Sequence, residues 1–243
     1  MTTLVRVAVA FLVALFLSSC GFDINIGDFS PGKKGNGNVV TDTREVNGEF
    51  TEVSASEGLM VYVTQADDFN IKVEADENII DLIATDINNG KLRIHAEENI
   101  GRATKKVYVS LPDITALSGS SGSQLNSKNT IKSNRLEIDG SSGALLDIEV
   151  VANDLEIDAS SGANLSVSGE ADDANVDVSS GGNINAKRLQ TKNCIADASS
   201  GGNVKIQVSE SLTADASSGG NIAYSGEPDV QKKKSVSGSV HKY

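Results

Sequence analysis

The chain has 243 residues, of which 39% are hydrophobic and 4% aromatic, and it contains 23 glycines and no tryptophan. Its formal net charge of −12 at pH 7 opposes binding to nucleic acid and to anionic lipid surfaces, because both present negative phosphates. A thick globular core needs more large side chains than this, so the composition favours a repeat protein with a thin core.

Residues 1–19 predict a signal peptide. Arg6 is followed by an uninterrupted apolar run over residues 7–17, which is too short to span a bilayer as a helix but suits a secretory signal. The phrase Leu17-Ser18-Ser19-Cys20 is similar to the bacterial lipobox, whose cysteine becomes lipidated after cleavage. We therefore predict lipid attachment at Cys20, with an ordinary signal peptide and an incidental cysteine as the alternative.

Residues 20–38 and 39–116 form two further segments. The first is rich in Gly and Asn and contains Pro31, so we predict a flexible tether. The second contains runs of β-branched and aromatic residues that are typical of short strands, at 59–63, 69–73, 92–94 and 107–111. Its larger hydrophobic residues predict a β-rich cap over one end of a repeat fold.

One stretch of this cap, residues 78–87, departs from the strand pattern. Its apolar residues are spaced for one face of a helix: Ile79, Leu82, Ile83 and Ile87. Asp76 stands where it can cap the first turn. A short helix or an irregular crossing is therefore expected there.

Residues 117–243 are organised by the phrase Ser-Ser-Gly, which occurs six times. Its first serines are Ser120, Ser141, Ser160, Ser179, Ser199 and Ser217. The steps between them are 21, 19, 19, 20 and 18 residues, a period typical of solenoids. Apolar and polar residues alternate before the phrase as in a half-buried strand, and a Gly/Ser/Asn turn and a second strand follow.

Burial energies decide how such a repeat folds. One repeat offers about four apolar side chains, worth roughly 1.5–3 kcal/mol each when buried. Fixing its backbone costs roughly 1–2 kcal/mol per residue, so a single repeat must stack on its neighbours. We predict an all-β fold: a single-stranded parallel β-helix (solenoid) with one coil per repeat of about 19 residues, closed by a last strand at 235–243.

Two columns of polar residues are predicted on this β-helix. An aspartate stands two residues before each of the last five phrases: Asp139, Asp158, Asp177, Asp197 and Asp215. An asparagine follows each of the last four turns: Asn164, Asn183, Asn203 and Asn221. We expect the asparagines to form a structural ladder of hydrogen-bonded amides. The aspartates, stacked about 4.8 Å apart, are a candidate row for a ligand or Ca²⁺, with solvation by serine hydroxyls and turn amides as the favoured interpretation.

Several phrases carry a resemblance to a known family. They are Phe50-Thr51-Glu52-Val53, Glu57-Gly58-Leu59-Met60-Val61-Tyr62-Val63, Ala75-Asp76-Glu77-Asn78-Ile79-Ile80, Gly90-Lys91-Leu92 and Val107-Tyr108-Val109-Ser110-Leu111-Pro112. With the lipobox before them and the Ser-Gly repeats after them, the chain resembles the head GIN domain family of auto-transporter adhesins over residues 42–240. The resemblance implies a β-helical fold, export and an adhesive role, and it supplies no catalytic residues.

The repeats contain no motif for catalysis. A hydrolytic serine needs a general base, and the only histidines, His95 and His241, stand in no motif. Basic and aromatic residues are too scattered for the polysaccharide lyases found among β-helices. Cys194 occupies an apolar column and is expected to be a buried hydrophobic residue. We therefore predict a protein with no catalytic residues, metal or cofactor.

The sequence thus predicts a non-enzymatic, lipid-anchored binding or structural protein of the bacterial cell envelope. It is expected to be an adhesin whose polar rows bind a cell-surface glycan or protein, and not nucleic acid, through many weak contacts. Gly21 after the lipidated cysteine favours the outer membrane, at the cell surface or on its periplasmic face. A periplasmic scaffold or accessory protein and a polysaccharide-active β-helix enzyme are the alternatives.

Overall fold

The computed structural model describes residues 32–233 and 237–243. The predicted signal peptide, Cys20 and the first part of the predicted tether lie outside these residues. Gly32–Tyr243 forms one structural unit. Within its described part, no helix is long and apolar enough to cross a membrane.

The segment before the repeats consists of short strands and one turn of 3₁₀ helix. These are β1 (Val39–Arg44), β2 (Glu52–Ala55), β3 (Met60–Gln65), β4 (Asn70–Asp76), η1 (Ile80–Leu82), β5 (Ile83–Asn88), β6 (Lys91–Ala96) and β7 (Lys105–Leu111). The predicted strand runs all form strands, because every second residue in them is apolar and buried, as Val61 and Val63 are in β3.

The repeats begin with two short strands and continue with long ones. They are β8 (Ala116–Gly119), β9 (Gln124–Ser127), β10 (Ile131–Gly140), β11 (Leu145–Ala159), β12 (Asn164–Val178), β13 (Asn183–Ala198), β14 (Asn203–Ala216), β15 (Asn221–Ser225), β16 (Asp229–Lys232) and β17 (Ser239–Lys242). The last strand, predicted at 235–243, corresponds to β17, which is shorter than predicted.

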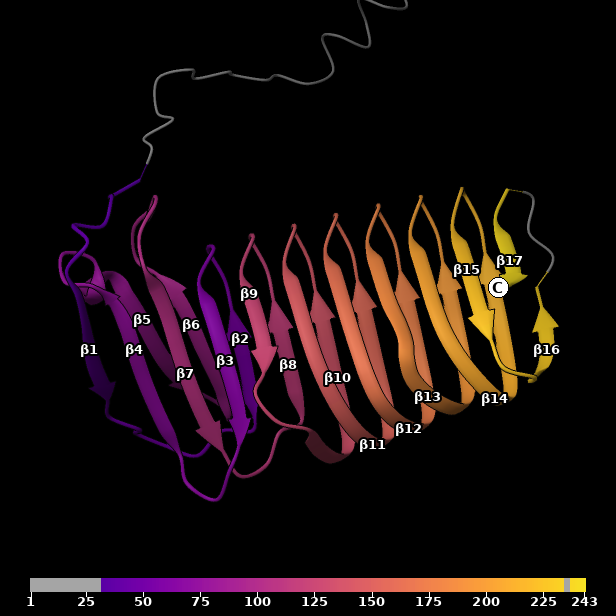
Figure 1. Ribbon diagram of the computed structural model, residues 1–243, viewed down its shortest axis with the longest axis horizontal. Helices are drawn as coiled ribbons and strands as arrows, with labels where there is room; N and C mark the ends of the chain where they lie inside the picture. Colours follow the sequence, from indigo (N-terminus) through magenta and orange to yellow (C-terminus); the bar gives the residue numbers. More distant parts are fainter. Residues whose placement is uncertain (1–31, 234–236) are drawn as a thin grey trace, which may run out of the picture. The chain divides into compact units, whose positions relative to one another are not determined.

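Each coil from β11 to β14 is one long strand that curves around a wide bend and ends at the next Ser-Ser-Gly phrase (Figure 1). β12 pairs in parallel with β11 on one side and with β13 on the other. Along β11, Leu155, Ile157 and Ala159 are buried in the core, whereas Glu156 and Asp158 between them point outward. The predicted parallel β-helix is confirmed.

The Ser-Ser-Gly phrase closes each coil as a tight turn in which two residues adopt the left-handed conformation. In the third copy φ is 49° at Ser161 and 75° at Gly162, and the amide of Ala163 donates to the carbonyl of Ser160 at 2.9 Å. Positive φ at both central residues defines the type I′ turn, whose twist matches the strands it joins. The amide of Gly162 also donates to the carbonyl of Ser180 in the next coil, so the turns stack as the strands do.

The unequal steps between the phrases are absorbed away from the turns. The register of β12 against β13 shifts between Ser166 and Ser168, and that of β13 against β14 shifts between Ala186 and Asn193. These positions lie toward the bend. Residues that flank the turns therefore stay opposite their equivalents in every coil, whatever the length of the repeat.

The coils of the cap do not follow chain order. β2 and β3 pair in parallel with β8 and β9 of the first repeat coil, and on their other side with β6 and β7. The later coil, β6–β7, thus lies outside the earlier one. Beyond it β4 and β5 run antiparallel to β7 and β6, and β1 runs antiparallel to β4 (Figure 1). The chain returns to the repeats through residues 112–115, where Thr115 donates its amide to the carbonyl of Thr51.

Of two expectations for the cap, one is confirmed in part and one is wrong. The short helix expected at 78–87 is the single 3₁₀ turn η1, and β5 follows it because pairing with β6 overrides the helical spacing. Asp76 does not cap this turn. Its buried carboxylate accepts hydrogen bonds from the amides of Gly37 and Thr104, each at 2.7 Å.

The folded part also begins earlier than residue 39. Residues 32–38, assigned to the tether in the sequence, are hydrogen-bonded to the cap. The amides of Lys33 and Gly35 donate to the carbonyls of Asn99 and Arg102 at 2.8 and 3.0 Å. A composition rich in Gly and Asn indicates flexibility only where the backbone groups find no partner, and here Asp76 and the loop before β7 supply partners.

The last coil ends the core with lysines. β16 and β17 pair in parallel with β14 and β15, which places Lys232 in register with buried Ala214 and Lys242 in register with buried Tyr224. Instead of entering the core, Lys232 donates to the carbonyl of Val240 at 2.8 Å. Charged side chains at these core-column positions oppose the addition of another strand to the exposed edge, so these lysines terminate the solenoid.

Candidate binding surface

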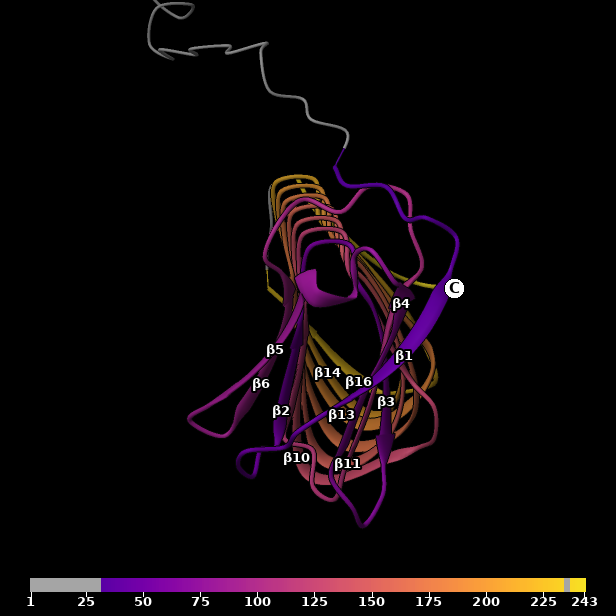
Figure 2. The same ribbon diagram turned by 90° about the vertical axis from the view of Figure 1, so that its left-hand side faces the viewer.

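The solenoid has two outer faces, joined by the turns on one side and by the bends on the other (Figure 2). The acidic face consists of the side chains that precede the turns, on β8, on the last halves of β10–β14 and on β16. The amide face consists of the side chains that follow the turns, on β9, on the first halves of β11–β14, on β15 and on β17. Because the coils are in register, each repeated position becomes a row along the solenoid.

The predicted aspartate row lies on the acidic face beside the turns. Its members pair in register: Asp139, Asp158, Asp177, Asp197 and Asp215. Burial raises the pKa of Asp158 to about 6, and repulsion by neighbouring carboxylates, first Glu156 and then Asp177, adds to the shift. Burial also raises the pKa values of Asp139 and Asp177. At neutral pH the carboxylates of Asp139, Asp158 and Asp177 are therefore negative charges that the folded chain disfavours.

Little positive charge neutralises this row. Among the described residues its one salt bridge joins Asp215 to Lys233 at 3.7 Å, at the C-terminal end. In the same part of the chain, no three carboxylate, histidine or cysteine groups lie close enough together to hold a metal ion. The row presents one carboxylate per coil, which differs from the convergent oxygen ligands of a protein Ca²⁺ site.

A groove of about 530 Å³ runs across β10–β14 on the acidic face, next to the aspartate row. Its lining includes Arg135, Asp154, Asp173, Asn193, Ile195 and Ser211. Leu155, Ala174 and Cys194 line it from below, because their side chains point into the core. The volume lies in the range of about 300–1,000 Å³ that is typical of ligand sites. This groove is the candidate site, and no sequence motif marks it.

The polar side chains of the groove are already ordered across coils. Asn193 donates from Nδ2 to Oδ1 of Asp173 at 3.0 Å, and Ser211 donates from Oγ to Oδ1 of Asn193 at 2.7 Å. Arg135 forms a salt bridge with Glu156 at 3.2 Å. Ile195 stands among them with 52% of its surface exposed. The groove thus combines fixed hydrogen-bonding groups with an apolar patch.

The predicted asparagine row lies on the amide face, with its members in register: Asn164, Asn183, Asn203 and Asn221. The bonds of these amides differ from the predicted ladder between coils. Asn164 donates from Nδ2 to the carbonyl of Gly162 at 3.1 Å, and Asn203 donates to that of Gly201 at 3.0 Å. Each bond stays within one coil and ties the start of a strand to its own turn.

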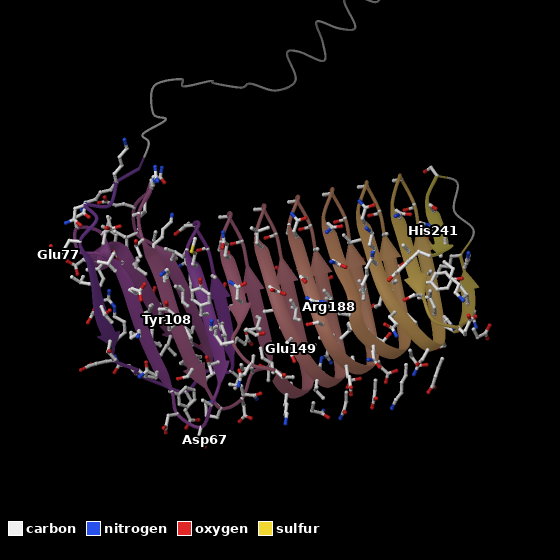
Figure 3. The ribbon with its side chains drawn as sticks, in the orientation of Figure 1. Asp67, Glu77, Tyr108, Glu149, Arg188 and His241 are labelled. Atoms are coloured by element: carbon white, nitrogen blue, oxygen red, sulfur yellow. The ribbon has the colours of Figure 1, made fainter. Side chains whose placement is uncertain are left out.

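A pair of tyrosines continues the amide face into the cap. Tyr62 on β3 and Tyr108 on β7 are in register, with ring centroids 5.2 Å apart and planes 19° apart. Nζ of Lys128 and Nζ of Lys72 lie 5.1 Å from the centroids of Tyr62 and Tyr108. Figure 3 shows Tyr108 on this face, together with Arg188 on β13. A repeated Val-Tyr-Val phrase, at 61–63 and 107–109, is the signal in the sequence that could have found this pair.

Residues 49–228 match a family model described as "Putative auto-transporter adhesin, head GIN domain". The chain belongs to this family. Among curated proteins, this head GIN domain has no significant match.

Solved structures share the fold of this head GIN domain. A putative adhesin from Bacteroides fragilis is 20% identical with a TM-score of 0.79, over 87% of this chain and 100% of that chain. A putative adhesin from Parabacteroides merdae is 21% identical with a TM-score of 0.70, over 86% and 98%. A putative lipid binding protein from Parabacteroides distasonis is 20% identical with a TM-score of 0.72, over 86% and 98%. These likenesses show that the β-solenoid is common to all four chains.

The residues with catalytic potential lie apart in this head GIN domain. His95 on β6 has Nδ1 3.6 Å from a carboxylate oxygen of Asp86, whereas His241 on β17 has Nδ1 3.4 Å from Oγ of Ser239. The strands that carry the two histidines, β6 and β17, lie toward opposite ends of the solenoid (Figure 1). Cys194 is buried as predicted, and desolvation raises the pKa of its thiol to about 12, which leaves it protonated and unreactive.

Proposed function

We propose that this head GIN domain is a non-enzymatic adhesin of the bacterial cell envelope, anchored by a lipid on Cys20, and that it contacts its partner through the acidic face. The observation that carries the proposal is the register, which repeats the same outward positions once per coil. Many weak contacts at fixed spacing bind strongly together, because each contact raises the effective concentration of the next.

The acidic face is the better contact surface of the two. On the amide face, the Nδ2 groups of Asn164 and Asn203 already donate hydrogen bonds to carbonyls of the adjacent turns. On the acidic face, most of the aspartate row has no ion pair among the described residues, and a groove runs beside it. Carboxylates without a paired cation keep their oxygen atoms available to accept hydrogen bonds from a partner.

The distribution of reactive groups supports a binding role without catalysis. Nucleophilic catalysis needs a nucleophile and a base within hydrogen-bond reach. The strands that carry the histidines lie toward opposite ends of the solenoid (Figure 1), and the Cys194 thiol is buried and protonated. A polysaccharide-active enzyme would lose its activity on one substitution, whereas a multivalent binder weakens in steps.

Location is tested by protease shaving of intact cells, followed by mass spectrometry for peptides of residues 40–243. Release of these peptides while a periplasmic control protein stays intact is the expected result. Protection until the outer membrane is breached would contradict the adhesin and favour a periplasmic scaffold. Mass spectrometry of the mature N-terminus tests the anchor, and an unmodified cysteine at position 20 would refute it.

The binding mode is tested by deleting one whole coil, residues 160–178, and measuring adherence of cells that display the protein. The deletion removes one repeat and leaves the turns before and after it in the same relation. A partial loss of adherence is expected, and deletion of two coils should weaken it further. Complete loss on a single outward substitution would indicate one localised site instead.

A further inference from the structure

The groove on the acidic face is long and follows the axis of the solenoid. Arg135 lies on β10 and Ser211 lies on β14, so the lining spans five successive strands. Four spacings of about 4.8 Å give a length of roughly 19 Å. A ligand that fills the groove is therefore an extended chain of several units that runs across the strands.

The groove offers side chains to such a ligand, and not backbone. The strands beneath it are paired on both sides, as Asp173 of β12 is with Asp154 of β11 and Asn193 of β13. Their amides and carbonyls are consumed by the sheet, so a peptide cannot bind by adding a strand. Recognition depends on carboxylate, amide and hydroxyl groups, which favour a ligand rich in hydroxyls over a peptide.

Two observations fit a sugar chain. The Ser211–Asn193–Asp173 relay fixes hydrogen-bonding groups along one line across three coils, so little side-chain freedom is lost on binding. Ile195 lies beside this line with half of its surface exposed. A sugar ring presents both kinds of surface, since its hydroxyls form hydrogen bonds and its C–H groups pack on apolar side chains.

The charge of the groove restricts the sugars. Arg135 is paired with Glu156, and within the described part of the chain Asp154 and Asp173 on the walls form no salt bridge. Asp177 of the aspartate row lies on the same strand as Asp173. Uronic acids and sulfated or sialylated sugars would be repelled by these carboxylates.

We propose that this groove binds a neutral glycan chain, laid along the solenoid axis, with the Ser211–Asn193–Asp173 line contacting hydroxyls and Ile195 contacting a ring face. The proposal rests on the adhesive function and names the partner class for its contact surface. Each unit contributes little, so affinity grows with chain length until the groove is filled.

The experiment titrates the mature lipidated protein in detergent with oligosaccharides of two, four and six units, by calorimetry. The probes are neutral gluco-, manno- and xylo-oligosaccharides, with oligogalacturonate as the acidic arm and a basic extended peptide as the peptide arm. A neutral series is expected to bind, with affinity rising by about tenfold or more from two units to six. Absence of binding by every neutral series overturns the proposal, as does tighter binding of the acidic or the peptide probe.

Two substitutions locate the binding. Asn193→Ala removes the centre of the relay and Ile195→Ser removes the apolar patch, and each is expected to weaken the six-unit chain by about tenfold. Asn183→Ala, on the amide face of the same strand β13, is the matched control and should leave binding unchanged. Equal affinity for all four proteins refutes the site.

If cells displaying Asn193→Ala still adhere fully, the groove is not the contact site although the adhesin stands. If protease cannot reach the protein, the adhesin fails although the groove can still bind glycan.

Discussion

The acidic and amide faces are made from the same repeat with the same register, and they differ in what their polar rows do. On the amide face, asparagine amides bond to the carbonyls of the adjacent turns, as Asn203 does to Gly201. On the acidic face, aspartates stand opposite one another, and burial, followed by repulsion from Glu156 and from the neighbouring aspartates, raises the pKa of Asp158 to about 6. The asparagine row stabilises the coil, whereas the aspartate row does not. A repeated residue is therefore not structural merely because it repeats.

The largest expected effect comes from breaking the bend that joins the two faces. Gly169 has φ 115°, and a Cβ built on it would lie 1.9 Å from the carbonyl oxygen of Val150 in the preceding coil. Gly169→Ala forces neighbouring coils apart and should reduce the free energy of unfolding by roughly 3 kcal/mol or more. Chemical denaturation followed by circular dichroism measures it.

The matched control is a glycine in a turn. Gly162 has φ 75°, but a Cβ built there meets no atom within 4 Å. Gly162→Ala should cost only about 1–2 kcal/mol, the strain of a left-handed alanine. Equal losses for the two variants would show that close packing of coils at the bend is not what holds the faces together.

The asparagine row is expected to respond to truncation with a moderate loss of stability. Asn203→Ala removes the bond to the carbonyl of Gly201 in a turn, which should lower the free energy of unfolding by about 1 kcal/mol. Thermal melting at pH 7 measures the change. Asn203→Asp serves as the control, because its carboxylate cannot donate this bond. If alanine were neutral and aspartate harmful, charge and not the turn bond would explain the row.

The sequence predicts the repeat, the alternation and both rows, because each depends on residues close in the chain. It does not predict that the coil β6–β7 lies outside the coil β2–β3. That order depends on which faces of the cap bury Leu92, Ile94, Val107 and Val109. Nor does it predict the left-handed second serine, because Ser161 obtains its conformation from the type I′ turn around it. The groove is missed for a similar reason. Its relay joins Asp173, Asn193 and Ser211, which stand at the same position of three successive repeats but differ in residue type, so no recurring residue draws attention to that column.

Removing a charge from the aspartate row is expected to have the opposite sign. Asp158→Asn deletes a carboxylate whose ionised form is disfavoured by burial and by its acidic neighbours. At pH 7 the free energy of unfolding should rise by on the order of 1 kcal/mol, less than the full pKa shift implies because solvent screens a half-exposed group. At pH 4 the gain should vanish, since the wild-type carboxyl is then protonated in the folded state. A destabilised variant at pH 7 would show that Asp158 has a stabilising partner.

The smallest effect is the pH dependence of the wild-type protein. Asp158 titrates near pH 6 when folded and near pH 4 when unfolded, so between these values the folded state holds more protons than the unfolded state. Stability therefore decreases as pH rises through this window, and Asp139 and Asp177, whose pKa values are also raised, add to the slope. Melting temperatures should be higher at pH 5 than at pH 7, and Asp158→Asn should flatten this difference. This window lies above the pH range in which Glu74 titrates. The pKa of Glu74 is lowered mainly by its hydrogen bond to Lys106, so its contribution to the free energy of unfolding is lost only at more acidic pH. A melting temperature that rose from pH 5 to pH 7 would mean that cations or hydrogen bonds neutralise the aspartate row in the folded protein, and the two faces would then differ less than their residues indicate.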